Sequence, residues 1–212
     1  FKEGVAFESH ERNSIYIDLF DSTNTNFNAL ISGSSGQGKS MLANKLLKNE
    51  LERGTKALVL DLGNSFQKNA KFHDGNIVSC EFNPLSFNDP SYLKAFVLSC
   101  VDDLLGKKEH GRLFSEIKKI VEESTNLTWG YFLGQLEKSF PGISFYFSEI
   151  NPYFTDKKEN FSHLTYCDLS LYPESMKAPI IIYLLECFKN IEGRKMYIFD
   201  ECWHLLTKNA EY

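Results

Sequence analysis

The feature that most constrains this chain is the glycine-rich run at residues 33–40, GSSGQGKS. Its spacing is G-x-x-x-x-G-K-[ST], which chance alone produces in roughly one in a hundred chains of this length. The apolar run FNALIS at residues 27–32 predicts a buried strand before it. A stripe of leucines after it predicts a helix from Ser40 to about Arg53, with Gly54 as its cap. Strand, glycine loop and helix form the context that a phosphate-binding loop requires.

The residue types in this loop indicate how it would hold a phosphate. Glycines adopt backbone conformations closed to other residues and let their N–H groups approach phosphate oxygens. The helix that follows directs the positive end of its dipole to the same place. We expect Lys39 to reach the β- and γ-phosphates and Ser40 to bind Mg²⁺. The alternative is a Gly/Ser turn with a surface lysine. The residues expected to contact the nucleotide are Gly33, Ser34, Ser35, Gly36, Gln37, Gly38, Lys39, Ser40 and Met41.

A second half of the site is predicted near the end of the chain. The four apolar residues 196–199 are typical of a buried parallel strand, and Asp200 and Glu201 follow them. Open α/β sheets bind ligands at the carboxyl ends of their strands. We expect Asp200 to hold the Mg²⁺ shell and Glu201, with Lys39, to be catalytic, Glu201 by orienting or deprotonating water. The alternative is a solvated acidic pair that opens a helix.

The remaining pattern predicts strands alternating with helices, and therefore an α/β domain with a mostly parallel sheet. We expect a short helix starting near Asn64 and Ser65, and Asp61 either capping that turn or contacting Mg²⁺ or water.

The aromatic run at 143–154 could form core or a partner surface. Further strands are expected at 13–20, 56–61, 76–80 and 164–172, and helices at 92–105, 112–123, 129–140 and 179–190, with 92–160 as a helical insertion.

Composition excludes some classes of protein. The 212 residues carry a formal net charge of −5, so the chain as a whole has no basic footprint for nucleic acid. The five cysteines form no C-x-x-C pair, which is typical of reduced thiols in the cytoplasm. The longest apolar run, residues 178–188, is too short to span a bilayer.

The order of motifs resembles a particular family. FNALISGSSGQGKS, VLDLGNSFQK, EFNPLS, YCDLSLY and KMYIFDECWHLL follow one another as in the C-terminal ATPase domain of TraC-type conjugation ATPases. These proteins serve bacterial type IV secretion systems. The similarity covers about residues 13–90 and 161–206. The glycine loop and the Asp-Glu pair are widespread, whereas DLGNSFQK, FNPL and DECWHLL, with Trp203, are more telling.

The resemblance implies a RecA-like P-loop NTPase fold spanning residues 1–212, an ATPase that uses ATP and Mg²⁺. It implies a hexamer that works with other secretion-system subunits. It also implies attachment through partners at the cytoplasmic face of the inner membrane. In that fold a further strand, with a sensor residue, lies between the Asp200 strand and the glycine-loop strand, and an arginine finger follows. The sequence ends at Tyr212, so we expect a fragment of a larger protein.

Three functions remain open from the sequence. The first is an ATP-hydrolysing motor that powers pilus assembly and substrate transfer. The second is a hexameric DNA translocase of the coupling-protein or FtsK/HerA kind, which the acidic balance disfavours because phosphate neutralisation needs clustered Lys and Arg. The third is a non-catalytic scaffold whose assembly depends on nucleotide, against which Glu201 argues.

Overall fold

The structure, a computed structural model, describes residues 4–78, 81–101, 105–155 and 161–201. Several residues considered above, Cys80 and the stretch Cys202–Leu206 with Trp203 among them, lie outside these ranges. Within the described part of the chain, no helix is both long and apolar enough to cross a bilayer.

The central sheet has four parallel strands in the order β4-β5-β3-β6. Its strands are β3 (Lys56–Asp61), β4 (Asn76–Ile77), β5 (Leu164–Asp168) and β6 (Lys195–Asp200). The strand predicted at 56–61 is confirmed. That predicted at 164–172 ends at Asp168 and lies inside the sheet, with all five of its residues buried. Of the strand predicted at 76–80, the first two residues are in β4.

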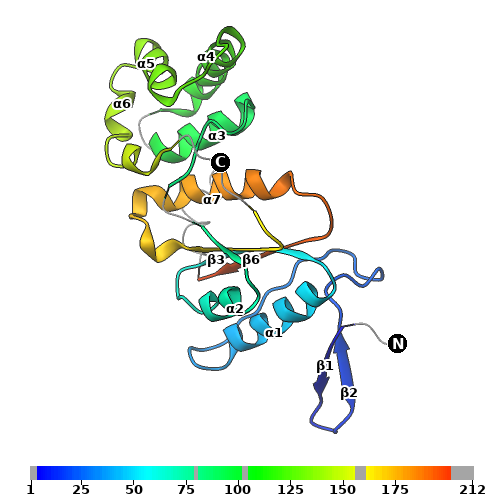
Figure 1. The fold of residues 1–212 in the computed structure, drawn as a ribbon. Helices are drawn as coiled ribbons and strands as arrows, with labels where there is room; N and C mark the ends of the chain where they lie inside the picture. Colours follow the sequence, from blue (N-terminus) through cyan, green and yellow to red (C-terminus); the bar gives the residue numbers. More distant parts are fainter. Residues whose placement is uncertain (1–3, 79–80, 102–104, 156–160, 202–212) are drawn as a thin grey trace.

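Helices cover both faces of this sheet (Figure 1). On one side lie α1 (Lys39–Glu52) and α2 (Gln67–Phe72), and on the other lies α7 (Glu174–Lys189). Beyond α7 lie α3 (Pro90–Val101), α4 (His110–Glu123), α5 (Trp129–Ser139) and α6 (Ile143–Tyr146). Short 3₁₀ turns occupy Lys107–Glu109, Asn151–Tyr153 and Leu169–Leu171. The predicted helices are thus present, although the treatment of 92–160 as a separate insertion stays a prediction.

Strand β3 contributes side chains to two hydrophobic cores, one on each face of the sheet. Leu58 and Leu60 face α7 and the outer helices, whereas Ala57 and Val59 face Leu47 of α1. This alternation follows from the two-residue period of a strand, which turns successive side chains to opposite faces. The larger core is rich in aromatic rings, and Trp129 packs against rings of the outer helices and the following turn.

The aromatic run at 143–154 divides between core and surface. Ile143, Phe147 and Ile150 are buried in the larger core, as core packing predicts. Phe145 and Tyr146, however, are exposed, with 78% and 40% of their surface accessible.

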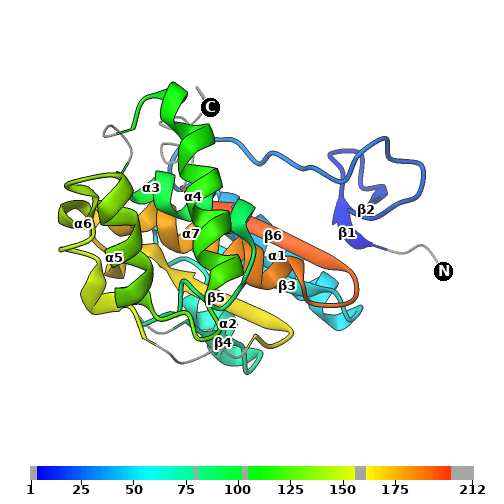
Figure 2. The ribbon, with the colours of Figure 1, turned by 90° about the horizontal axis from the view of Figure 1, so that it is seen from above.

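The strand predicted at residues 27–32 is wrong for the described structure. This segment joins no sheet, and Figure 2 shows it as part of a long connection from the N-terminal hairpin towards α1. Leu30 is 93% exposed. A strand needs a neighbour for its backbone N–H and C=O groups. In the fold expected from the resemblance, that neighbour is a further strand between residues 27–32 and β6. Among the described residues no such strand is present.

The same arrangement corrects the prediction that the strand before Asp200 is buried. β6 is parallel, as predicted, but it is an edge strand whose described partner is β3 alone. Tyr197 and Phe199, which alternate along one face, are 39% and 40% exposed.

A separate antiparallel hairpin precedes the domain. It consists of β1 (Val5–Glu8) and β2 (Ser14–Ile17), so the strand predicted at 13–20 is shorter and belongs to a two-stranded sheet of its own. Lys45 of α1 holds this hairpin: its Nζ donates to the Ala6 carbonyl at 2.9 Å and lies 4.2 Å from the centre of the Phe7 ring.

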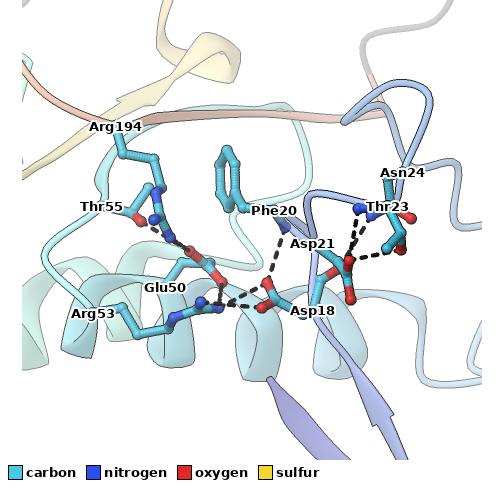
Figure 3. Close-up of polar contacts among 9 residues, drawn as sticks. All are labelled: Asp18, Phe20, Asp21, Thr23, Asn24, Glu50, Arg53, Thr55 and Arg194. Atoms are coloured by element: carbon cyan, nitrogen blue, oxygen red, sulfur yellow. Dashed lines mark hydrogen bonds and ion pairs between the residues drawn. The ribbon is translucent and has the colours of Figure 1, made fainter. Parts of the chain in front are cut away.

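A charge network fixes the end of α1 (Figure 3). Arg53 forms hydrogen bonds of 2.8 Å to Asp18 Oδ1 and 2.9 Å to Glu50 Oε1. Glu50 is only 2% exposed, and its other oxygen accepts a 2.8 Å bond from the Thr55 hydroxyl. Arg194, just before β6, lies 3.9 Å from Glu50. The network therefore joins the N-terminal segment, α1, and the starts of β3 and β6.

Candidate functional site

The glycine loop leads directly into α1 and is open to solvent. Gly36 and Gly38 have φ of +77° and +84°, a region that other residues rarely enter. A Cβ added at either position would meet no heavy atom within 4 Å. Both positions therefore face open space, and the absence of side chains there leaves room for a ligand to approach the loop.

Lys39 closes over this loop. Its Nζ donates a 3.1 Å hydrogen bond to the carbonyl of Ser34, and Gln37 N donates to the same carbonyl at 3.3 Å. α1 begins at Lys39, and its N-cap Gly38 has no side chain with which to cap the first N–H groups. The ammonium group and the start of the helix thus provide positive charge on the same side of the loop.

Three neighbouring strands end in aspartate at the same level of the sheet. Asp61 of β3 is in register with Asp168 of β5 and with Asp200 of β6. Asp168 accepts a 3.0 Å bond from Ser170 N. The structure therefore places three carboxylates in a row at the carboxyl edge, where parallel sheets bind ligands.

Asp61 holds the turn that follows β3. It is fully buried and accepts bonds from Gly63 N at 2.8 Å and Phe66 N at 3.0 Å. The Tyr166 hydroxyl donates to it at 3.3 Å. Of the two roles considered from the sequence, this geometry is that of a cap. The helix expected near Asn64 begins only at Gln67, because Asn64 is in the left-handed region with φ of +56°.

Asp200 is where the two halves of the site meet. Burial raises the pKa of its carboxyl above the usual range, and the nearby charges of Asp61 and Glu201 raise it further. A hydrogen bond from Ser65 and the positive charge of Lys39 act in the opposite direction. Lys39 of the glycine loop is therefore near enough for its charge to lower the pKa of an aspartate about 160 residues later in the sequence.

Glu201 follows in an unusual backbone conformation. Its φ is +56°, which costs a residue with a side chain about 1–2 kcal/mol. The side chain leans over Gly63: a Cβ added there would lie 3.5 Å from Glu201 Oε2. The glutamate is exposed at the same edge as Asp200. Such strain occurs where function fixes a side chain in place, and it is consistent with an active-site residue.

The donors present suit Mg²⁺ together with a nucleotide. Ser40 and Asp200 offer hydroxyl and carboxylate oxygens, the ligands that Mg²⁺ prefers. In the described ranges no group of three His, Cys, Asp or Glu residues could hold a metal by itself. Mg²⁺ at nucleotide sites takes only one or two protein ligands and completes its shell with phosphates and water.

Two residues at this site were not expected from the sequence. The Nδ2 of Asn44 donates to the carbonyls of Ser40 at 2.8 Å and Ser65 at 3.3 Å. Ser65 in turn lies beside Asp200 and lowers the pKa of its carboxyl. One sequence signal could have identified Asn44: it is four residues after Ser40, and therefore on the same side of α1.

Fold and site together define an α/β domain of the RecA-like P-loop class. The family model of the TraG P-loop domain matches residues 8–107, somewhat less than half of the chain. A solved structure, VirB4 of Thermoanaerobacter pseudethanolicus, is similar over 96% of this chain and 68% of that one. Its TM-score is 0.74 at 17% sequence identity, so the likeness concerns the fold. No curated protein sequence matches significantly.

Proposed function

We propose that this chain is an ATP-hydrolysing motor domain of a bacterial type IV secretion or conjugation system. One observation carries the proposal: α1, which the glycine loop opens, and the Asp200–Glu201 pair that ends β6 both adjoin the turn after β3, where Asn44 of α1 bonds the Ser65 carbonyl and Glu201 leans over Gly63. The match to the TraG P-loop domain and the fold shared with VirB4 support the choice of secretion motor among P-loop proteins.

Each residue has a distinct task in this proposal. The backbone N–H groups of residues 33–38 hold phosphate oxygens, and Lys39 turns from the Ser34 carbonyl to the β- and γ-phosphates. Ser40 and Asp200 hold Mg²⁺, which when bound would neutralise charge that develops on the phosphates. Met41, 79% exposed, extends the nucleotide contact beyond the loop.

Glu201 orients the attacking water and accepts its proton. Its side chain is at the carboxyl edge of the sheet and is exposed, so water can reach it. A general base contributes about 10²–10⁴-fold in rate. A protein that only binds nucleotide needs no base at this position, which favours the motor over the scaffold.

The assembly is proposed on the resemblance. We propose a homo-hexamer that joins other secretion-system subunits, and that reaches the cytoplasmic face of the inner membrane through them. The net charge of −5 disfavours a DNA translocase, since clustered cations are what DNA phosphates need. DNA binding that weakens steeply with salt would favour the translocase instead.

Nucleotide titration of two variants tests the proposal. We expect Lys39→Ala to weaken binding of Mg·ATP strongly, measured by calorimetry, because the charge facing the phosphates is lost. Lys48→Ala is the matched control, since Lys48 is on the same helix and its side chain is 56% exposed in a surface ion pair. Equal affinity in Lys39→Ala and wild type would refute the phosphate-loop assignment.

Steady-state hydrolysis tests the role of Glu201. We expect Glu201→Gln to bind Mg·ATP as wild type does but to lose about 10²–10⁴-fold in turnover, because the amide cannot accept a proton. Glu52→Gln, an exposed change on α1, is its control. A Glu201→Gln rate within a few-fold of wild type would show that Glu201 is not the base and would favour the scaffold.

A further inference from the structure

The two side chains proposed to share Mg²⁺ lie on different elements, a helix and a strand. Ser40 is on α1, whereas Asp200 ends β6. The segment that precedes the glycine loop forms no strand pairing among the described residues. Leu47 anchors the middle of α1 in the smaller core, about two turns beyond Ser40. The charge network of Arg53 and Glu50 joins α1 to the starts of β3 and β6, but at the opposite end of the helix from Ser40. Contacts of the first turn therefore bear most directly on the spacing between Ser40 and Asp200.

Asn44 provides the first half of such a contact. Its Nδ2 donates to the Ser40 carbonyl at 2.8 Å and to the Ser65 carbonyl at 3.3 Å. Its Oδ1 accepts a 2.8 Å bond from Asn69 Nδ2 of α2. Both ends of the amide are thus occupied, which fixes its orientation. Asn44 ties the first turn of α1 to the turn after β3.

Ser65 provides the second half. Its carbonyl accepts from Asn44 at 3.3 Å. Its hydroxyl lies near enough to the carboxylate of Asp200 to lower the pKa of that group. The turn that carries Ser65 is itself held by buried Asp61, which accepts from Gly63 N and Phe66 N. Ser65 is therefore presented from a fixed turn, on the side that faces the Asp200 carboxylate.

We propose that Asn44 and Ser65 form a polar bridge that positions Ser40 and Asp200 relative to one another for Mg²⁺. They are positioning residues, because they act through Ser40 and Asp200. The proposal rests on the proposed function, since it assumes that Mg²⁺ with a nucleotide occupies this site. Outer-shell hydrogen bonds of this kind typically change metal affinity about 10–100-fold when they are removed.

The bridge predicts a specific effect on how strongly Mg²⁺ increases the affinity for ATP. The dissociation constant for ATP is measured by calorimetry in excess EDTA and in excess Mg²⁺, and their ratio is the Mg²⁺ enhancement. We expect Asn44→Ala and Ser65→Ala each to reduce this ratio about tenfold. The affinity in EDTA should stay within about twofold of wild type, because the glycine loop and Lys39 still hold the phosphates.

Matched controls come from the same chain. Asn190 donates to the carbonyl four residues before it at 3.0 Å, as Asn44 does, but at the far end of α7. Ser115 donates to the Gly111 carbonyl within α4. Asn190→Ala and Ser115→Ala should keep the wild-type ratio. Ser65→Thr, which keeps the hydroxyl, should restore most of it.

The possible results separate the two claims. If the wild-type chain binds no ATP in either buffer, the proposed function fails and the bridge fails with it. If the wild type binds with a clear Mg²⁺ enhancement that both alanine variants retain, the bridge alone is overturned. A parallel loss in EDTA and in Mg²⁺ would also overturn it, because the two residues would then only support the fold of the loop.

Discussion

Arg53 offers the sharpest test of how the N-terminal segment is held to the domain. It bonds Asp18 and Glu50 at 2.8 and 2.9 Å, and its side chain is 20% exposed against 12% and 3% for these partners. We consider Arg53→Met, which keeps an apolar stem of similar length and removes the charge. The change leaves Glu50 buried, with Thr55 and the more distant Arg194 as its described partners.

The cost follows from the burial of Glu50. Removing one member of a buried ion pair costs about 3–5 kcal/mol, because the other charge stays desolvated. Since Arg53 keeps some exposure, we expect the lower end, about 3 kcal/mol. For a chain of this size that lowers Tm by about 6–12 °C. Lys48→Met, which breaks an exposed pair with Glu52 at 3.8 Å, should change stability by less than about 1 kcal/mol.

The pH dependence gives a second reading of the same variant. The hydrogen bond from Arg53 is the main cause that lowers the pKa of Asp18 below its usual value. A lowered pKa contributes stability above the ordinary carboxyl pKa and loses it as the pH falls through the folded value. Arg53→Met lacks this contribution, so its deficit should narrow on acidification.

The assay is thermal and urea unfolding of both variants from pH 7 to about pH 3. Glu50→Gln in the Arg53→Met background should recover part of the loss, because it removes the stranded charge. A deficit for Arg53→Met no larger than that of Lys48→Met would refute the reasoning, and it would mean that Glu50 is solvated despite its burial.

Two further variants probe the site and its support. Asp200→Asn, in Mg²⁺-free buffer, should be more stable than wild type at pH 7. Because the pKa of Asp200 is raised in the folded protein, wild-type stability falls as the pH rises from the ordinary carboxyl pKa through the folded value, and the amide avoids this loss. The gain should vanish below the ordinary carboxyl pKa of about 3.9, and a less stable Asp200→Asn at pH 7 would contradict it. Leu47→Ala, at a fully buried position under α1, should cost about 2–5 kcal/mol in urea unfolding, whereas Leu30→Ala, at a 93% exposed position, should cost almost nothing.

Much of the fold could be predicted because the elements carry local signals. The apolar run of β3 and the leucine stripe of α1 have the periods of a buried strand and a one-sided helix. The apolar run at 27–32 has the same strand signal, yet it forms no strand in the described structure. A strand is defined by its neighbour, and periodicity does not report whether that neighbour is present.

The site was predicted unevenly for a related reason. Motif spacing pointed to Lys39, Ser40, Asp200 and Glu201, and in the structure both α1 and the Asp-Glu pair adjoin the turn after β3. Ser65 and Asn44 have no motif of their own. Their roles arise from the packing of α1 against the turn after β3, a contact between segments 21 residues apart that single-sequence patterns do not encode.

The attachment of the hairpin has a mechanical consequence. Lys45 fastens it to α1 through the Ala6 carbonyl and the Phe7 ring, less than two helical turns from Lys39. The β1–β2 hairpin is thus attached to α1, the helix that begins at the glycine loop. We expect the hairpin to move with α1 as one rigid body when the helix tilts. A small displacement at the glycine loop then becomes a larger displacement at the far end of the hairpin. The distance between a spin label on the hairpin and one on α1 should be the same with and without nucleotide. A change in that distance would show that the hairpin moves relative to the helix.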